Sequence, residues 1–161
     1  MSSVSAFNTP LETGIRTLII LVEAFPAKYD LNRLVEMDYL VVHSGDYGGP
    51  ESLHAPLPMR SGELLVRRSI IEKGILLMIS RMLILRSYSE MGILYSASES
   101  AHEFTNSFTS KYLIELSNRA SWVVDNFGEM SIKEIRNNNK AVYKQWYTQF
   151  YPGNEIGQKY E

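Results

Sequence analysis

The stretch at residues 70–79, IIEKGILLMI, most restricts how this chain can fold, because apolar side chains occupy almost every direction around a helix drawn through it. The surrounding pattern predicts a helix over residues 61–81. A helix of this kind needs neighbours on most sides, so we expect it to be largely buried, with Ile75 and Leu76 in the core. Gly74 lies in its middle, where glycine costs about 1 kcal/mol relative to alanine. It therefore predicts a neighbouring helix that approaches closely at this point.

The elements around this helix have clear start and stop signals. Pro10 suits the first position of a helix over residues 10–24, and Asp30 can cap a second helix over 31–42. After the third helix, two apolar runs flank the turn residue Gly92, which predicts a β-hairpin. Three helices followed by a hairpin is the order of a winged helix, and another small α+β arrangement is the alternative.

The rest of the chain is predicted to be helical. Apolar spacing favours a short helix within residues 97–108 and a longer one over 110–127, and Ser131 can cap a last helix that is interrupted or loosened at 137–139. The predicted fold class is thus mainly α (α+β), a winged-helix-like domain with a two-stranded β-hairpin and additional C-terminal helices. The predicted units are a winged-helix-like core at 1–96 with an inserted loop at 43–62, and a C-terminal helical extension at 97–161 that packs on the core.

Composition excludes several kinds of protein. The chain has 161 residues and no cysteine, which excludes disulfides and cysteine-based zinc sites and fits a reducing cytoplasm. A formal net charge of −2 argues against a protein that coats nucleic acid by bulk charge. The N-terminus lacks the pattern of a signal peptide, and the longest apolar stretches are too short to span a bilayer. We expect a cytoplasmic protein without a membrane segment.

The inserted loop reads HSGDYGGPESLHAPLPMRSGE and invites three chemical interpretations. His43, Asp46 and His54 could be metal ligands, but a zinc site needs three or four ligands at fixed angles, and these residues do not define such a set. The glycines are not followed by the lysine of a P-loop, and no Gly-x-Ser-x-Gly motif marks a nucleophile. We therefore predict no catalytic, cofactor or metal site, and expect His43 and Asp46 to bond the loop's own backbone.

Apolar and aromatic residues suggest that the loop and the last helix serve a partner. Tyr47, Leu53 and Leu57 are spread along the loop as apolar anchors, and the loop's prolines reduce the entropy cost of ordering it. The last helix interleaves basic residues with Trp146 and Tyr147, which are typical of protein interfaces but could also stack on bases or complete a core. The predicted docking residues are Tyr47, Leu53, His54, Leu57, Trp146 and Tyr147.

Basic residues make contact with DNA the competing interpretation. The third helix and its flanks carry an excess of arginine and lysine, but this helix becomes apolar almost at once and lacks the exposed polar face that reads bases. Contact with phosphates is compatible with the sequence, whereas base readout is not favoured. The predicted phosphate contacts are Arg67, Arg68, Lys133, Arg136 and Lys140.

The segment from Asp38 to Arg68, DYLVVHSGDYGGPESLHAPLPMRSGELLVRR, carries a resemblance to a known family. Together with the rest of residues 11–81, it resembles the small middle component of bacterial three-component ABC-ATPase systems. The hairpin and the sequence ASWVVDNF at 120–127 also fit this family. Its members are similar to the small subunit of Lamassu-type defence operons.

The resemblance implies a role in a complex. In such systems a large SMC/Rad50-like ATPase senses foreign DNA, a second large protein, often a nuclease, is the effector, and the small component joins them. The expectation is a non-catalytic adaptor in anti-phage or anti-plasmid immunity, with the ATPase and the effector as partners and only weak, non-specific DNA contact of its own. The alternative is a free-standing winged-helix DNA-binding transcriptional regulator.

Overall fold

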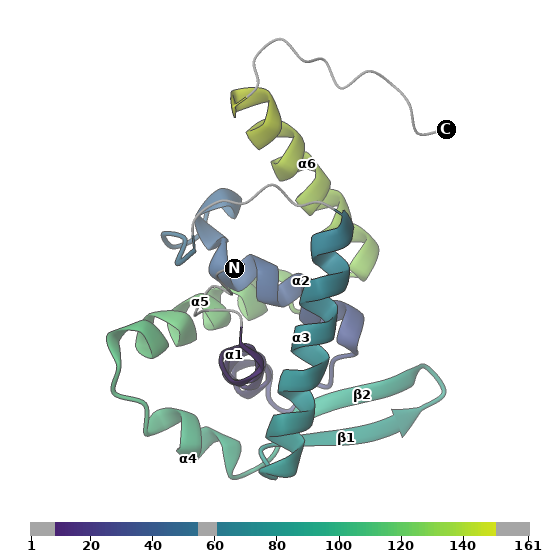
Figure 1. Cartoon of the computed structure of the whole chain (residues 1–161), viewed down its shortest axis with the longest axis vertical. Coiled ribbons are helices and arrows are strands. Elements are labelled where there is room, and N and C mark those ends of the chain that lie inside the picture. Colours follow the sequence, from purple (N-terminus) through teal and green to yellow (C-terminus); the bar gives the residue numbers. More distant parts are fainter. Residues whose placement is uncertain (1–8, 55–60, 151–161) are drawn as a thin grey trace, which may run out of the picture.

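The computed structural model describes residues 9–54 and 61–150, apart from the side chains at 61–65, 143 and 145–150, and it shows a mainly helical fold with one β-hairpin (Figure 1). The expected mainly α class is confirmed, as is the order of the elements. In chain order these are α1 (Pro10–Ala24), α2 (Leu31–Val42), the 3-10 helix η2 (Ser44–Tyr47), α3 (Ser61–Ser80), β1 (Ile84–Ser89), β2 (Gly92–Ala97), α4 (Ala101–Asn106), α5 (Lys111–Phe127) and α6 (Ile132–Phe150).

Helix α1 forms the centre of the fold. Figure 1 shows it nearly end-on, with α3 on one side and α5 on the other, and it packs against both. Thr9 caps it by accepting a hydrogen bond from the Glu12 amide at 3.3 Å, and Pro10 occupies its first turn. The side chains from Leu18 to Leu21 are consecutive and all buried, so the helix is covered on nearly every side over this stretch.

Helix α3 is buried on one face only, so the expectation of burial on most sides is wrong. Its buried residues, Ile71, Gly74, Ile75 and Met78, recur at the spacing of a single helix face. Leu76 is 51% exposed, whereas Ile75 is 1% exposed, so only the second of these two expected core residues is in the core. The physical reason is that the apolar side chains point in all directions while α1 and α2 cover one side of the helix.

Gly14 and Gly74 bring the backbones of α1 and α3 into contact. A Cβ atom on Gly14 would lie 2.7 Å from the Gly74 carbonyl oxygen, and a Cβ atom on Gly74 would lie 2.6 Å from the Gly14 nitrogen. Real Cβ atoms do not approach other atoms this closely. Any residue other than glycine at either position would therefore force one of the two helices to move. The close approach predicted at Gly74 is confirmed.

Strands β1 and β2 form an antiparallel hairpin that closes through a turn at Glu90 and Met91. Gly92 follows the turn with φ +109°, a conformation that favours glycine. A bridge between Tyr29 and Tyr95, with N–O distances of 2.9 and 2.8 Å, joins the segment before α2 to the outer edge of β2. One bridging residue is not a third strand, so the winged-helix assignment stays a prediction.

Helix α6 runs without interruption through Asn137–Asn139, so the expected break is wrong. Asn139 is buried and donates a hydrogen bond to the Glu36 carboxylate of α2 at 2.6 Å. Arg136 donates to the same carboxylate at 3.1 Å. These bonds to α2 stabilise the helix through a stretch of low intrinsic helix propensity.

Buried residues from both sides of the predicted division at residue 96 share one hydrophobic core. The side chains of Leu116, Ala120 and Val123 on α5, and of Ile135 on α6, cluster with those of α1 and α2. The C-terminal helices therefore pack directly on the first part of the chain. The division into two units stays a prediction.

Candidate functional site

Three helices meet at a buried ion cluster formed by Arg16, Asp38 and Arg67. The Asp38 carboxylate, on α2, is 0% exposed and accepts hydrogen bonds from Nε and Nη2 of Arg16 at 2.8 and 3.2 Å. Arg67, on α3, donates through Nη1 to Oδ2 of Asp38 at 2.5 Å. Its guanidinium also lies over the Tyr39 ring, 5.5 Å from the ring centroid. The ion cluster thus ties α1, α2 and α3 together.

The two arginines keep Asp38 ionised despite its burial. Burial alone would raise the pKa of the Asp38 carboxyl, but the attraction of Arg16 and then of Arg67 lowers this pKa below its ordinary value. Burial alone would likewise lower the pKa of Arg16, but the Asp38 carboxylate raises it. Removing one partner of a buried ion pair costs about 3–5 kcal/mol, because the remaining charge is left uncompensated.

His43 and His54 lie beside the ion cluster as packed imidazoles. The buried His43 ring lies tilted against Tyr39, with centroids 4.5 Å apart, and meets the His54 ring edge-on at 6.4 Å. Nε2 of His54 is 2.9 Å from the Tyr112 hydroxyl oxygen on α5. Burial, followed by the charge of a nearby arginine, lowers the pKa of each histidine to about 4. Both rings are therefore neutral at neutral pH.

Serine side chains fasten the first part of the inserted loop to itself. Ser44 donates its hydroxyl to the Pro50 carbonyl at 2.8 Å, and Ser52 accepts a backbone amide through its hydroxyl oxygen at 3.0 Å. Within the part of the chain that the structure describes, the side chains of His43 and Asp46 make no such bond to the loop backbone. The role that we expected for those two residues belongs to the serines.

Helix α5 covers the same part of the loop. Arg119 donates through Nε and Nη2 to the Glu51 carbonyl oxygen at 3.0 and 2.9 Å. Trp122 packs so closely that a Cβ atom on Gly49 would lie 2.7 Å from the indole ring. The sequence signal for this contact is Gly49 itself, since its backbone conformation is one that other residues also adopt and only the contact with Trp122 requires glycine. The loop is thus held against α5 over several residues.

The predicted docking residues of the loop that the structure describes turn their side chains inward, toward the rest of the subunit. Tyr47 and Leu53 pack against the subunit's own hydrophobic core, and Tyr47 meets Phe127 edge-on with centroids 6.2 Å apart. His54 contacts Tyr112 as described above. These side chains support the loop from within, so their removal should destabilise the fold. Leu57 and the side chains of Trp146 and Tyr147 lie outside the described residues.

The predicted phosphate contacts do not form one surface. Arg67 belongs to the ion cluster, and Arg68 donates to the side-chain oxygen of Asn32. Lys133 and Lys140 are exposed on α6. The half-exposed Arg136 lies between them on the same face of that helix. Among these five described residues, only the three on α6 form a row of cations that is open to solvent.

The family of this chain follows from a comparison over nearly its whole length. The family model described as ABC-three component (ABC-3C) system Middle Component 2 matches residues 6–149. The chain belongs to this family. Membership of this family implies that the chain associates with the other components of its ABC-3C system. No curated protein and no solved structure matches it.

Sequence reasoning missed Arg16 and Asp38 of this middle component. Asp38 is a charged residue on a helix face that is otherwise apolar, and Arg16 lies close to the apolar run from Leu18 to Leu21, a pattern that indicates a buried partner. The pattern does not say which partner, because Arg16 and Asp38 lie 22 positions apart on different helices. Only the packing of α1 on α2 reveals the pair.

The described part of this middle component lacks two other kinds of feature. Residues 9–54 and 61–150 contain no group of three histidine, aspartate or glutamate residues that could hold a metal ion. Over the same residues, no helix is long and apolar enough to cross a bilayer. What the site residues do is hold the loop in a fixed position against α2 and α5.

Proposed function

We propose that this middle component is a non-catalytic adaptor that joins an SMC/Rad50-like ATPase to an effector, often a nuclease, in anti-phage or anti-plasmid defence. The ATPase would sense foreign DNA, and the adaptor would bring the effector to it, as in the Lamassu-type systems that the sequence resembles. Family membership supports the proposal, since a middle component has other components to bind. The winged-helix-like order of elements supports it too, because accessory subunits of this shape bind partner proteins.

The observation that carries the proposal is an uncovered apolar face on the hairpin. By the strand register, Tyr88 and Ile93 pair directly across the hairpin, yet they are 75% and 42% exposed. Met91, in the turn, is 89% exposed. Figure 1 shows the tip of the hairpin extending beyond the helices. On the inner half of the same face Ile84, Tyr95 and Ala97 are buried, and Arg86, opposite Tyr95, is exposed.

Clustered apolar side chains at the end of a projecting element indicate a surface for a protein partner. A hairpin that only completed the subunit's own core would end where the core ends, close to Tyr95. The strands instead carry exposed apolar side chains at Tyr88 and Ile93, beyond the helices that pack on the hairpin. We therefore propose the outer hairpin, defined as Tyr88, Met91 and Ile93, as one docking surface.

The fastened loop is the second surface that we propose. Asp46, Gly48 and Glu51 lie on its exposed side, while Tyr47 and Leu53 hold that side in place from beneath. A loop that is ordered before binding loses little conformational entropy when a partner docks. The remaining proposed partner contacts near the loop and on α6 are His54, Leu57, Trp146 and Tyr147.

The test is copurification of the chain with the large ATPase and effector that we expect adjacent genes to encode. We expect the three proteins to elute together, and the double change Tyr88→Thr and Ile93→Thr to release one of them while a thermal melt shows the same Tm. Ile114→Gln is the matched control, since Ile114 is an exposed apolar residue on α5, away from the hairpin. A double variant that assembles like the parent would remove the hairpin from the proposal.

A weak contact with DNA is a subsidiary part of this proposal. Lys133, Arg136 and Lys140 would meet phosphates, so the affinity should be independent of base sequence and fall steeply with salt. Tight binding of the isolated chain to one operator sequence at physiological salt would instead favour the transcriptional regulator and contradict the adaptor.

A further inference from the structure

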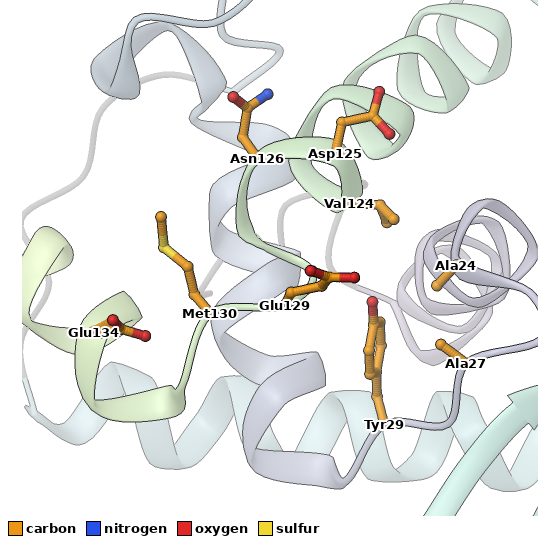
Figure 2. A pocket seen from close by; sticks show the side chains of 10 residues that line it. Ala24, Ala27, Tyr29, Val124, Asp125, Asn126, Glu129, Met130 and Glu134 are labelled. Atoms are coloured by element: carbon orange, nitrogen blue, oxygen red, sulfur yellow. The ribbon is translucent and has the colours of Figure 1, made fainter.

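A cavity of about 710 Å³ opens between the end of α1 and the turn that joins α5 to α6 (Figure 2). This volume falls in the range of about 300–1,000 Å³ that is usual for ligand sites. Its apolar wall includes Ala24, Ala27 and Val124, and its rim carries the carboxylates of Asp125 and Glu129. No lysine, arginine or histidine is among its described lining residues. The cavity therefore combines an apolar wall with an acidic rim.

The Tyr29 side chain provides a second and independent feature of this cavity. Tyr29 is only 7% exposed, and its hydroxyl makes no hydrogen bond with any residue that the structure describes. Figure 2 shows the ring standing in the cavity with the hydroxyl directed toward the side of Glu129. Burial raises the pKa of Tyr29. The charge of Arg33, which lies over the ring 5.4 Å from its centroid, opposes this rise in pKa, and Glu129 adds to it. The hydroxyl is thus protonated at neutral pH and has its oxygen available to accept a hydrogen bond.

The absence of a side chain at Gly128 provides space for the Tyr29 hydroxyl. A Cβ atom at position 128 would lie 3.0 Å from the Tyr29 hydroxyl oxygen and 2.5 Å from the Val124 carbonyl oxygen. A larger residue would therefore push the hydroxyl out of its place.

The ends of two helices add to the negative character of the cavity. Helices α1 and α5 both finish at its wall, and the C-terminal end of a helix carries partial negative charge. Arg33 balances part of this charge, because it donates to the carbonyl oxygens of Phe127 and Gly128 at 3.4 and 3.2 Å. Asp125 and Glu129 themselves make no hydrogen bond or ion pair through their side chains with the described residues. Both carboxylates therefore remain open to an added cation at the rim of the cavity.

We infer that this cavity receives the side chain of a lysine or arginine that another component of the system presents. The ammonium or guanidinium group would lie beside Glu129 and donate a hydrogen bond to the Tyr29 hydroxyl oxygen, while Asp125 adds negative charge to the rim. The aliphatic stem would lie along Ala24 and Val124, since lysine and arginine bury their stems on apolar surface while the charged head meets polar groups. This inference rests on the proposed adaptor function and specifies one contact of it. A free polyamine has the same alkylammonium chemistry, so the experiment must separate the two sources.

The first arm of the test uses the full isolated chain labelled with ¹⁵N. Nα-acetyl-arginine amide and Nα-acetyl-lysine amide should shift the amide signals of Tyr29 and Gly128 in a saturable way. The neutral citrulline analogue should bind about tenfold more weakly or worse, because it lacks the charge-assisted hydrogen bonds. Spermidine is the probe for the other source, and binding of spermidine alone, without either amino-acid amide, overturns the inference.

Variants locate the effect in the cavity. Asp125→Asn with Glu129→Gln should abolish the shifts, and Tyr29→Phe should weaken binding while leaving the fold intact, since the hydroxyl has no partner to lose. Glu90→Gln with Glu103→Gln is the matched control, because both residues are exposed elsewhere and the change in net charge is the same. Equal binding by the cavity double variant and this control overturns the inference.

The second arm uses the complex and separates this inference from the adaptor function. If the parent chain copurifies with the large components, the cavity double variant should lose at least one of them and the control variant should lose none. Assembly that survives the cavity changes overturns the cavity inference and leaves the adaptor function standing. A parent chain that copurifies with neither component contradicts the adaptor function, whatever the titration shows.

Discussion

Asp38 balances two arginines from two other helices while lying entirely out of contact with solvent. Its value to the fold comes from its charge and from both of its oxygens, because an amide of the same shape would accept hydrogen bonds at only one position and could not offset Arg16. We predict that Asp38→Asn lowers the free energy of unfolding by about 3–5 kcal/mol, as expected when a buried ion pair loses one partner. Urea unfolding monitored by circular dichroism would measure it.

Asp125→Asn is the control at this scale, since Asp125 is exposed and makes no ion pair or side-chain hydrogen bond within the described part of the chain. It should change the free energy of unfolding by no more than about 0.5 kcal/mol. Similar losses for the two variants would show that the charge of Asp38 is not what holds the three helices.

Helix α3 is the element in which sequence pattern and three-dimensional position differ most. Adjacent Ile75 and Leu76 look equivalent in the sequence, but only Ile75 faces α1. We predict that Ile75→Ala costs about 2–5 kcal/mol, because it leaves a cavity in the core. Leu76→Ala should cost well under half of that, because the side chain is already half in water. Thermal or chemical unfolding of the two variants measures the difference, and equal losses would contradict the orientation of α3.

The boundaries of the helices were predictable because they depend on nearby residues. Thr9, Asp30 and Ser110 each accept a hydrogen bond at the start of a helix, and each stands next to a periodic apolar run. The side of α3 that is buried, the continuity of α6 and the partners of Asp38 were not predictable, because they depend on residues far along the chain. The loop followed the same rule. Tyr47 and Leu53 look like free anchors until α5 is packed over them.

The whole molecule should lose stability as the pH falls below neutral. His43 and His54 have an ordinary pKa of 6.5 and a pKa of about 4 in the folded chain, so the unfolded chain binds more protons between these values. Their contribution is fully present above pH 6.5 and is lost as the pH falls toward 4. We predict a loss of about 3 kcal/mol for His43 and less for the partly exposed His54, at 1.36 kcal/mol for each unit of pKa.

Urea unfolding at a series of pH values from 7.5 to 4.5 would measure this loss. His54→Gln should flatten the pH profile, whereas His102→Gln, at an exposed position on α4, should leave it unchanged. A profile that stays level down to pH 4.5 would contradict the neutral state of the two imidazoles.

The contact between Gly14 and Gly74 has a consequence for how this family can diverge. At each glycine the atoms that a methyl group would strike belong to the main chain of the opposite helix, which every amino acid shares. A substitution at one position therefore has no compensating substitution at the other. In a library randomised at both sites and selected for folding, we expect glycine to be retained at each independently, with no covariation between them. Two residues in direct contact would then escape any method that infers contacts from correlated change.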